Sequence, residues 1–352
     1  MRPLAILLLL LTPLIASAAE YPSHGVVLMY HRFGEDRYPS TNVRLEQFES
    51  QLDYLQHEGF HIWPLRKLVK ALFSGEPVPD KSVALSVDDA YLSVYEHAFP
   101  IIRSRGLPLT VFVSTDAVDR GLHGFSTWAQ MREMQAHGID FANHSASHEH
   151  LLERLAGEGD EAWRQRVKAD IEKAQQRLEQ ELGRDNLPLF AYPFGEFDNA
   201  LGSLVREMEY IGFGQQSGAI GDFSALHALP RFPINEQFSD LDRFAVKVAT
   251  LPLPVSGQSL RDPLVTGENP PRLTLQLVPG EERLAGHINC FLGNGTPLKV
   301  LERGAGSITV QAVTALDPGR NRYNCTAAAG SGRFYWFSQP WLNGPDAADP
   351  AH

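Results

Sequence analysis

The sequence has few cysteines, no excess of basic residues, and no long apolar run beyond its first residues. Only Cys290 and Cys325 are present among 352 residues, and they form no C-x-x-C pair, which argues against a thiolate metal site. Acidic residues outnumber basic ones by 42 to 31, giving a formal net charge of -11. This charge argues against nucleic acid and anionic membrane surfaces as partners. The length allows one large domain and a small one.

An apolar run does occur at the N-terminus. It spans Leu4 to Ile15 after a basic start, and Ala16-Ser17-Ala18 follows as an A-x-A cleavage site. The run is too short and too close to this site for a permanent membrane helix. We therefore expect residues 1–18 to be a signal peptide cleaved after Ala18, and the mature protein to be periplasmic or secreted. An oxidising compartment favours a disulfide between Cys290 and Cys325, the alternative being two buried thiols in a β core.

Apolar strands alternate with amphipathic helices over residues 24–250, which predicts a mostly parallel sheet that is closed or nearly closed into a barrel. Strands are expected near 26–31, 60–63, 83–88, 109–114, 139–143, 189–192, 210–215 and 228–232. Helices are expected near 45–58, 65–73, 91–105, 127–137, 161–182 and 199–209, and the charged helix 161–182 is expected on a solvated exterior.

The pattern changes after residue 250. Residues 251–271 are rich in Pro, Gly and Asp and are expected to form a linker. Short strands separated by Gly- and Pro-containing turns then predict a small antiparallel β-sandwich over 272–345. The aromatic residues Phe334 to Phe337, together with Trp341, either line a sugar-binding face or pack a core.

Three predicted strand ends carry side chains that could bind a metal or act in catalysis. Asp88 and Asp89 close an apolar strand, where adjacent carboxylates require a cation or a raised pKa. His144 and His148 are four residues apart, a spacing that can place both on one helical face to bind one metal. Taken alone, the first pair also fits a helix N-cap and the second a polar loop. The third end runs into Tyr192-Pro193-Phe194-Gly195, and three such ends in this order indicate a metal site with a spare carboxylate.

These motifs resemble those of polysaccharide deacetylases of the NodB-homology type, carbohydrate esterase family 4. The family motif T-F-D-D-G appears as Ser86-Val87-Asp88-Asp89-Ala90, and H-[ST]-x-x-H is matched in full by residues 144–148. R-x-P-[FY]-G appears as Ala191-Tyr192-Pro193-Phe194-Gly195. The strand Val27-Leu28-Met29-Tyr30-His31-Arg32 resembles the poly-β-1,6-N-acetylglucosamine deacetylase subgroup. The resemblance implies a distorted (β/α)7 barrel.

The resemblance also implies roles for individual residues. It implies a divalent metal, Zn²⁺ with Co²⁺ or Ni²⁺ as alternatives, held by Asp89, His144 and His148. Asp88 is then the general base, and the Phe194 backbone N–H stabilises the oxyanion. His31 is the expected general acid, with a buried structural histidine as the alternative.

The chain departs from the family at two places. Ala191 stands where the family has an Arg that supports the base, although the subgroup often lacks this Arg. No late L-x-H motif is found, and Leu226-His227 is its nearest match.

The sequence allows more than one role for some further residues. Tyr192, Trp128 and Arg231 are candidates to shape the sugar site, and each equally fits packing or a structural ion pair. His150 is a weaker candidate ligand.

The sequence therefore predicts an exported, metal-dependent N-deacetylase acting on acetamido groups of an N-acetylglucosamine-containing polysaccharide. One alternative is a non-catalytic polysaccharide-binding or assembly protein on a decayed barrel. Another is a metal-dependent amidase or esterase with a non-sugar substrate. Metal content together with acetate release from N-acetylglucosamine oligomers separates the three.

Overall fold

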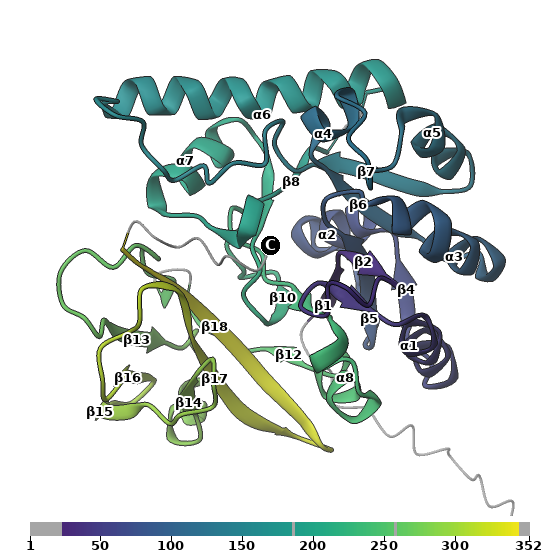
Figure 1. Cartoon of the computed structure of the whole chain (residues 1–352). Helices are drawn as coiled ribbons and strands as arrows, with labels where there is room; N and C mark the ends of the chain where they lie inside the picture. Colours follow the sequence, from purple (N-terminus) through teal and green to yellow (C-terminus); the bar gives the residue numbers. More distant parts are fainter. Residues whose placement is uncertain (1–22, 185–186, 257–258, 345–352) are drawn as a thin grey trace, which may run out of the picture.

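The computed structural model describes residues 23–184, 187–256 and 259–344, so the expected signal peptide lies outside the described residues. A curled sheet forms the larger part of the molecule (Figure 1). Its strand order is β10-β1-β5-β6-β7-β8-β9, with β11 on β1 and β4 on β5. The strands are β1 (His24–Tyr30), β4 (His61–Trp63), β5 (Ser82–Val87), β6 (Leu109–Val113), β7 (Ile139–Asn143), β8 (Leu189–Ala191), β9 (Ile211–Phe213), β10 (Ala219–Gly221) and β11 (Phe232–Pro233).

The two ends of the parallel sheet are joined by one segment of chain. Leu229 forms a parallel bridge with Phe213 of β9, and Phe232 pairs in parallel with Leu28 of β1. The sheet therefore curls round on itself, as the predicted distorted barrel requires. Of the strands that the structure describes in this sheet, only β10 runs antiparallel, against the start of β1.

Helices cover the outside of the sheet, and α6 lies along one side of it (Figure 1). They are α1 (Leu45–His57), α2 (Leu65–Ser74), α3 (Phe99–Arg105), α4 (Thr115–Asp119), α5 (Trp128–Ala136), α6 (Asp160–Leu182), α7 (Asn199–Glu207) and α8 (Leu241–Val248). A π-helical turn η1 (Val94–Ala98) precedes α3, and the short 3₁₀ turns are η2 (Pro193–Gly195), η3 (Glu236–Phe238) and η5 (Glu282–Gly286). The small strands β2 (Arg32–Phe33) and β3 (Asn42–Val43) pair with each other.

The long helix α6 lies on the exterior, as its charge predicted, but it also packs against the barrel. It buries a stripe at helical spacing, formed by Trp163, Val167, Ile171, Ala174 and Leu178. This stripe fixes the helix against the barrel, because apolar burial is the main source of helix stability in proteins. None of the helices that the structure describes has the length and apolar character that a membrane crossing requires.

Two further sheets follow the barrel in the chain. One has the order β12-β18-β17-β14 and the other β13-β16-β15. The strands are β12 (Leu251–Pro252), β13 (Arg272–Gln276), β14 (Asn289–Leu292), β15 (Lys299–Arg303), β16 (Ser307–Gln311), β17 (Gly319–Gly330) and β18 (Arg333–Asn343). Side chains of both sheets share one core, including Leu273, Ile308, Tyr323 and Trp341, so they pack as a sandwich. The pairing is antiparallel except for β12, which runs parallel to β18 and comes from the expected linker.

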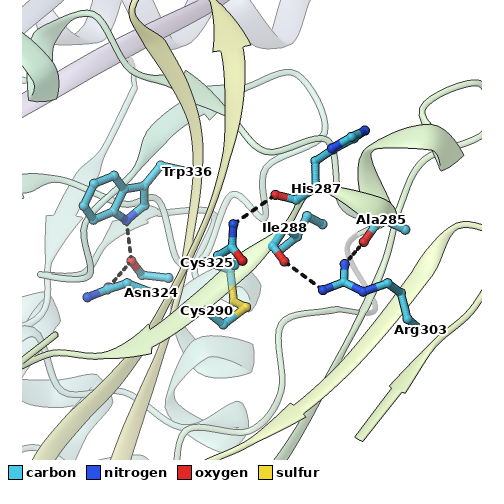
Figure 2. The surroundings of a disulfide bond; sticks show 10 residues. Ala285, His287, Ile288, Cys290, Arg303, Asn324, Cys325 and Trp336 are labelled. Atoms are coloured by element: carbon cyan, nitrogen blue, oxygen red, sulfur yellow. Dashed lines mark hydrogen bonds between the residues drawn. A yellow bond between two sulfur atoms is a disulfide. The ribbon is translucent and has the colours of Figure 1, made fainter. Parts of the chain in front are cut away.

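Cys290 and Cys325 face each other on paired strands of this sandwich and form a disulfide (Figure 2). The predicted pairing is therefore confirmed. Beside it, Arg303 donates hydrogen bonds to the carbonyl oxygens of Ala285 and Ile288, which ties β15 to the turn before β14.

The sandwich and the barrel are in direct contact. Trp336 of β18 packs edge-on against Phe232 of β11, with 5.5 Å between the ring centroids. Arg333 donates to the Ala249 carbonyl and pairs with Asp80 at 2.9 Å. The aromatic run that begins at Phe334 thus places at least Trp336 in packing against the barrel.

Candidate active site

The chemically active side chains gather where the parallel strands end. Asp88 and Asp89 follow β5, His144 follows β7, and Phe194 follows β8. His31 follows β1, which pairs in parallel with β5. Because parallel strands of a barrel present their carboxyl ends at one rim, residues distant in sequence meet there.

Asp89, His144 and His148 form a compact group. Asp89 Oδ1 lies 3.3 Å from His144 Nε2 and 3.0 Å from His148 Nε2. Ligand atoms around a tetrahedral ion with bonds of 2.0–2.1 Å are about 3.3 Å apart. The spacing therefore fits a single ion bound by all three atoms.

Two further observations fit a metal at this position. Asp89 Oδ1 is buried and, among the residues that the structure describes, accepts no hydrogen bond of acceptable geometry, although both imidazoles point a nitrogen at it. His144 Nδ1 lies 2.8 Å from the Ala191 carbonyl oxygen, to which it donates its proton. This hydrogen bond leaves the Nε2 lone pair for a ligand, as is usual for metal-binding histidines.

The two histidines meet in a loop, and the expectation that they share a helical face is wrong. Residues 144–148 contain no helical turn, and Ser145 and His148 have positive φ angles of 64° and 55°. The loop is held from outside, since Asp170 of α6 accepts hydrogen bonds from the N–H groups of Ala146 and Ser147. The spacing of four therefore positions both rings through a folded loop.

Asp88 is bound on its other side by Arg231. The guanidinium donates to both carboxylate oxygens, at 2.6 and 2.8 Å, and also donates to the Gly214 carbonyl. Both side chains are fully buried. Arg231 thus provides the support that Ala191 cannot give, and of its two proposed roles the structure shows the ion pair.

The charges of the site keep both aspartates ionised. Burial opposes ionisation of Asp88, but the Arg231 guanidinium and the imidazoles of His144 and His31 together outweigh it and hold the pKa of the carboxyl below its usual value. Burial likewise opposes ionisation of Asp89, and the facing imidazoles hold its pKa well below the usual value. An ionised Asp88 is able to accept a proton, as a general base must.

His31 stands at the rim beside these carboxylates. Burial lowers its pKa, while the nearby charges of Asp88 and Asp89 act in the opposite direction. The same histidine lines a pocket of about 580 Å³ together with Phe194 and Gly195. Its side chain is half-buried and lines the pocket, so a packing role alone does not describe it.

Phe194 sits in a tightly fixed turn. Its φ angle is +58°, and its ring stacks on His150 at 4.0 Å between centroids. His150 Nδ1 lies 2.7 Å from Glu196 Oε2, which makes His150 part of this turn and not of the metal group. Arg320 of β17 donates to the Phe194 carbonyl at 3.1 Å, so the sandwich contributes to the rim of the site.

Three sequence-derived candidates lie elsewhere. Trp128, the first residue of α5, donates a hydrogen bond from its indole N–H to Asp119 at the end of α4. Tyr192 is buried among aromatic side chains and donates its hydroxyl proton to the His227 carbonyl at 2.7 Å. These contacts indicate a surface role for Trp128 and a packing role for Tyr192. They also place His227 beside Tyr192 on the α7 side of the sheet.

Sequence reasoning missed Asp170 and Arg320 as site residues. Asp170 is one charge among many on α6, and Arg320 lies in another domain, so neither carries a motif. A short-range signal for Asp170 did exist, because it lies on the helix directly after the histidine motif in the chain.

Comparisons with known proteins agree with this geometry. The family model described as polysaccharide deacetylase matches residues 75–212. The poly-β-1,6-N-acetyl-D-glucosamine N-deacetylase of Escherichia coli K12 is 24% identical over 269 residues, which cover 66% of this chain and 39% of that protein. The protein of the same name from Staphylococcus epidermidis is 23% identical over 214 residues, covering 59% of this chain and 73% of that protein.

Solved structures share the barrel. The deacetylase PplD of Streptococcus pyogenes superposes with a TM-score of 0.58 at 22% identity, covering 64% of this chain and 99% of PplD. IcaB from Ammonifex degensii gives 0.55 at 24% identity, covering 65% of this chain and 98% of IcaB. The matching family model, this shared fold and the rim of ionised carboxylates and imidazoles together lead to one assignment. Residues 75–212 are thus assigned to the polysaccharide deacetylase family, hydrolases that act on carbon–nitrogen bonds.

Proposed function

We propose that the protein is an exported, metal-dependent N-deacetylase that releases acetate from acetamido groups of an N-acetylglucosamine-containing polysaccharide. The observation that carries this proposal is the buried Asp89 oxygen, which faces two imidazole nitrogens and accepts no hydrogen bond within the described part of the chain. Beside it, Asp88 forms a buried ion pair with Arg231, which keeps its carboxylate ionised, and Asp88 is not needed as a metal ligand, so it can act as the base.

Asp89, His144 and His148 would hold the metal, which in such a mixed nitrogen and oxygen site is Zn²⁺, or alternatively Co²⁺ or Ni²⁺. A bound divalent ion polarises a carbonyl oxygen and lowers the pKa of water.

Asp88 accepts the proton of the attacking water, because its carboxylate is ionised and held in one orientation by Arg231. The backbone N–H of Phe194 donates to the developing oxyanion. His31 gives a proton to the departing amine nitrogen, which would otherwise leave as a very poor anionic leaving group. Acetate and a free amino sugar result.

Two similar proteins support the substrate class. The Escherichia coli and Staphylococcus epidermidis relatives are named for poly-β-1,6-N-acetyl-D-glucosamine. The similar Streptococcus pyogenes deacetylase was solved in complex with acetate, the acid that this reaction would release. Export is supported by the disulfide, which oxidising compartments favour.

The test combines metal content and acetate release. Purified protein should contain one divalent ion per chain and release acetate from N-acetylglucosamine oligomers. H148A should lose both, because one of three ligands is removed. H57A is the matched control, since His57 is an exposed histidine at the end of α1. Full activity after exhaustive chelation would contradict the proposal.

A further inference from the structure

A pocket of about 580 Å³ lies between the barrel rim and the sandwich. His31 and Phe194 line it on the barrel side, and Arg320 and Arg322 of β17 line it on the sandwich side. It therefore opens directly beside the residues proposed to act on the acetamido group.

Strand alternation aims both arginines at the barrel. Tyr323 and Cys325 of β17 are fully buried in the sandwich core. Because neighbouring strand residues point to opposite faces, Arg320 and Arg322 share the other face of the strand. Two cations are thus placed two residues apart, facing one pocket.

The two arginines differ in their partners. Arg320 donates to the Phe194 carbonyl and lies 3.9 Å from Glu196 Oε1. The Arg322 side chain, among the residues that the structure describes, forms no hydrogen bond and no ion pair. It is nevertheless half-buried, and both burial and the charge of Arg320 lower the pKa of its guanidinium. A cation in this position is costly unless an anion joins it.

The remaining lining suits a sugar. Gln215 offers its side-chain amide and Asn321 its amide oxygen for hydroxyls, and Phe238 offers an apolar face, whereas the Asn235 amide is engaged by Ser40 and Phe238. Amides, one aromatic ring and paired guanidinium groups form a lining for a saccharide that also carries an oxyanion. With a net charge of -11, the whole protein does not attract polyanions in general, so this recognition is local.

We propose that this pocket binds an anionic sugar next to the acetamido unit, through a carboxylate or an ester-linked phosphate paired with Arg322 and Arg320. The substrate is then an acidic heteropolymer and not a neutral N-acetylglucosamine homopolymer. This inference rests on the proposed deacetylase function for the position of the acetamido unit. The binding of the acidic sugar itself is independent of turnover.

Two measurements on the full-length protein test the pocket. The first is the melting temperature in glucuronic acid, glucose 6-phosphate or glucose. The acidic sugars should raise it for the wild type and for R283Q, and not for R322Q, while glucose should leave it unchanged. The acidic sugar that raises the melting temperature more shows whether the pocket prefers a carboxylate or a phosphate. R283Q is a matched control because Arg283 is an exposed arginine of the same sandwich.

The second measurement is kcat/KM on two kinds of oligosaccharide. R322Q should lower kcat/KM about 10- to 100-fold on oligomers that alternate N-acetylglucosamine with glucuronic acid or contain phosphorylated sugars. It should leave kcat/KM unchanged on neutral N-acetylglucosamine oligomers. R322K should show an intermediate loss, since it keeps the charge but not the planar fork.

The outcomes separate the two proposals. Equal losses on both substrates, with a lower melting temperature for R322Q, would make Arg322 a structural residue and overturn the anion site. The absence of any shift with acidic sugars would overturn it as well. If no acetate is released from any substrate but acidic sugars still stabilise the wild type and not R322Q, the deacetylase function fails and the anion site stands.

Discussion

At the scale of single residues, the site is built from unfavourable backbone conformations. Asp89, Ala90, Ser145, His148 and Phe194 all have φ angles between 55° and 73°. Left-handed conformations cost non-glycine residues about 1–2 kcal/mol each. All five lie at or beside the proposed metal site and oxyanion turn, where strain is typical of positions fixed by function.

The paired burial of Asp88 and Arg231 gives a prediction about the base. D88N should keep the metal but reduce turnover by about 10²- to 10⁴-fold, since the proton acceptor is lost while the shape remains. Because the buried guanidinium loses its counter-charge, the free energy of unfolding should fall by about 3–5 kcal/mol. Metal content, kinetics and denaturant unfolding check this. Metal loss in D88N with metal retained in D89N would reverse the two roles.

His31 gives a prediction about pH. Burial lowers its pKa below the usual 6.5, so the protonated form that donates a proton is lost as pH rises through a value below 6.5. The descending limb of kcat/KM against pH should therefore begin in this acidic range, and H31A should lose both the limb and most of kcat. Near-normal kcat with an unchanged limb in H31A would reject the role and direct attention to His227.

At the scale of elements, helix α6 holds the histidine loop. Its buried stripe docks it on the barrel, and Asp170 then faces the N–H groups of Ala146 and Ser147. The ligands are thus positioned by a helix that contributes none of them.

D170A should therefore weaken metal affinity about 10- to 100-fold, as loss of outer-shell support typically does, although every ligand remains. Competition with a chelator measures the affinity. D170N should recover part of it, because its amide oxygen still accepts a hydrogen bond. Replacement of Glu172, an exposed residue on the same helix, is the control. Unchanged affinity in D170A would show that the loop keeps its shape without α6.

At the scale of the whole molecule, the sandwich and the barrel act as one unit. Strand β12 continues from the barrel and pairs with β18, while Trp336 packs on Phe232 and Arg320 reaches the Phe194 carbonyl. The order of the sandwich is therefore coupled to the order of the active-site rim.

The disulfide tests this coupling. Cys290 and Cys325 are 35 residues apart, for which the chain-entropy model gives about 3–4 kcal/mol of stabilisation. C290S/C325S should lower the melting temperature of the sandwich, and acetate release should fall at temperatures where the sandwich unfolds. Calorimetry and activity measured over the same temperatures check both effects. Activity that persists after the sandwich has melted would show that the barrel works alone.

The features that depend on local sequence pattern were predictable before the structure. The strand ends at Asp88, His144 and Phe194 were predicted within a residue or two, because apolar periodicity and Gly turns mark where strands stop. The disulfide was also favoured from the sequence, because the expected export implies an oxidising compartment and the chain has only these two cysteines.

The contacts between distant segments became visible with the folded chain. Arg231 lies 143 residues from Asp88, and closure of the barrel through β11 brings them together. The same holds for Arg320, which contacts the rim from β17, a strand that pairs with β18, which in turn pairs with β12. Periodicity encodes which face of an element is buried, but it carries no information on which distant side chain that face will meet.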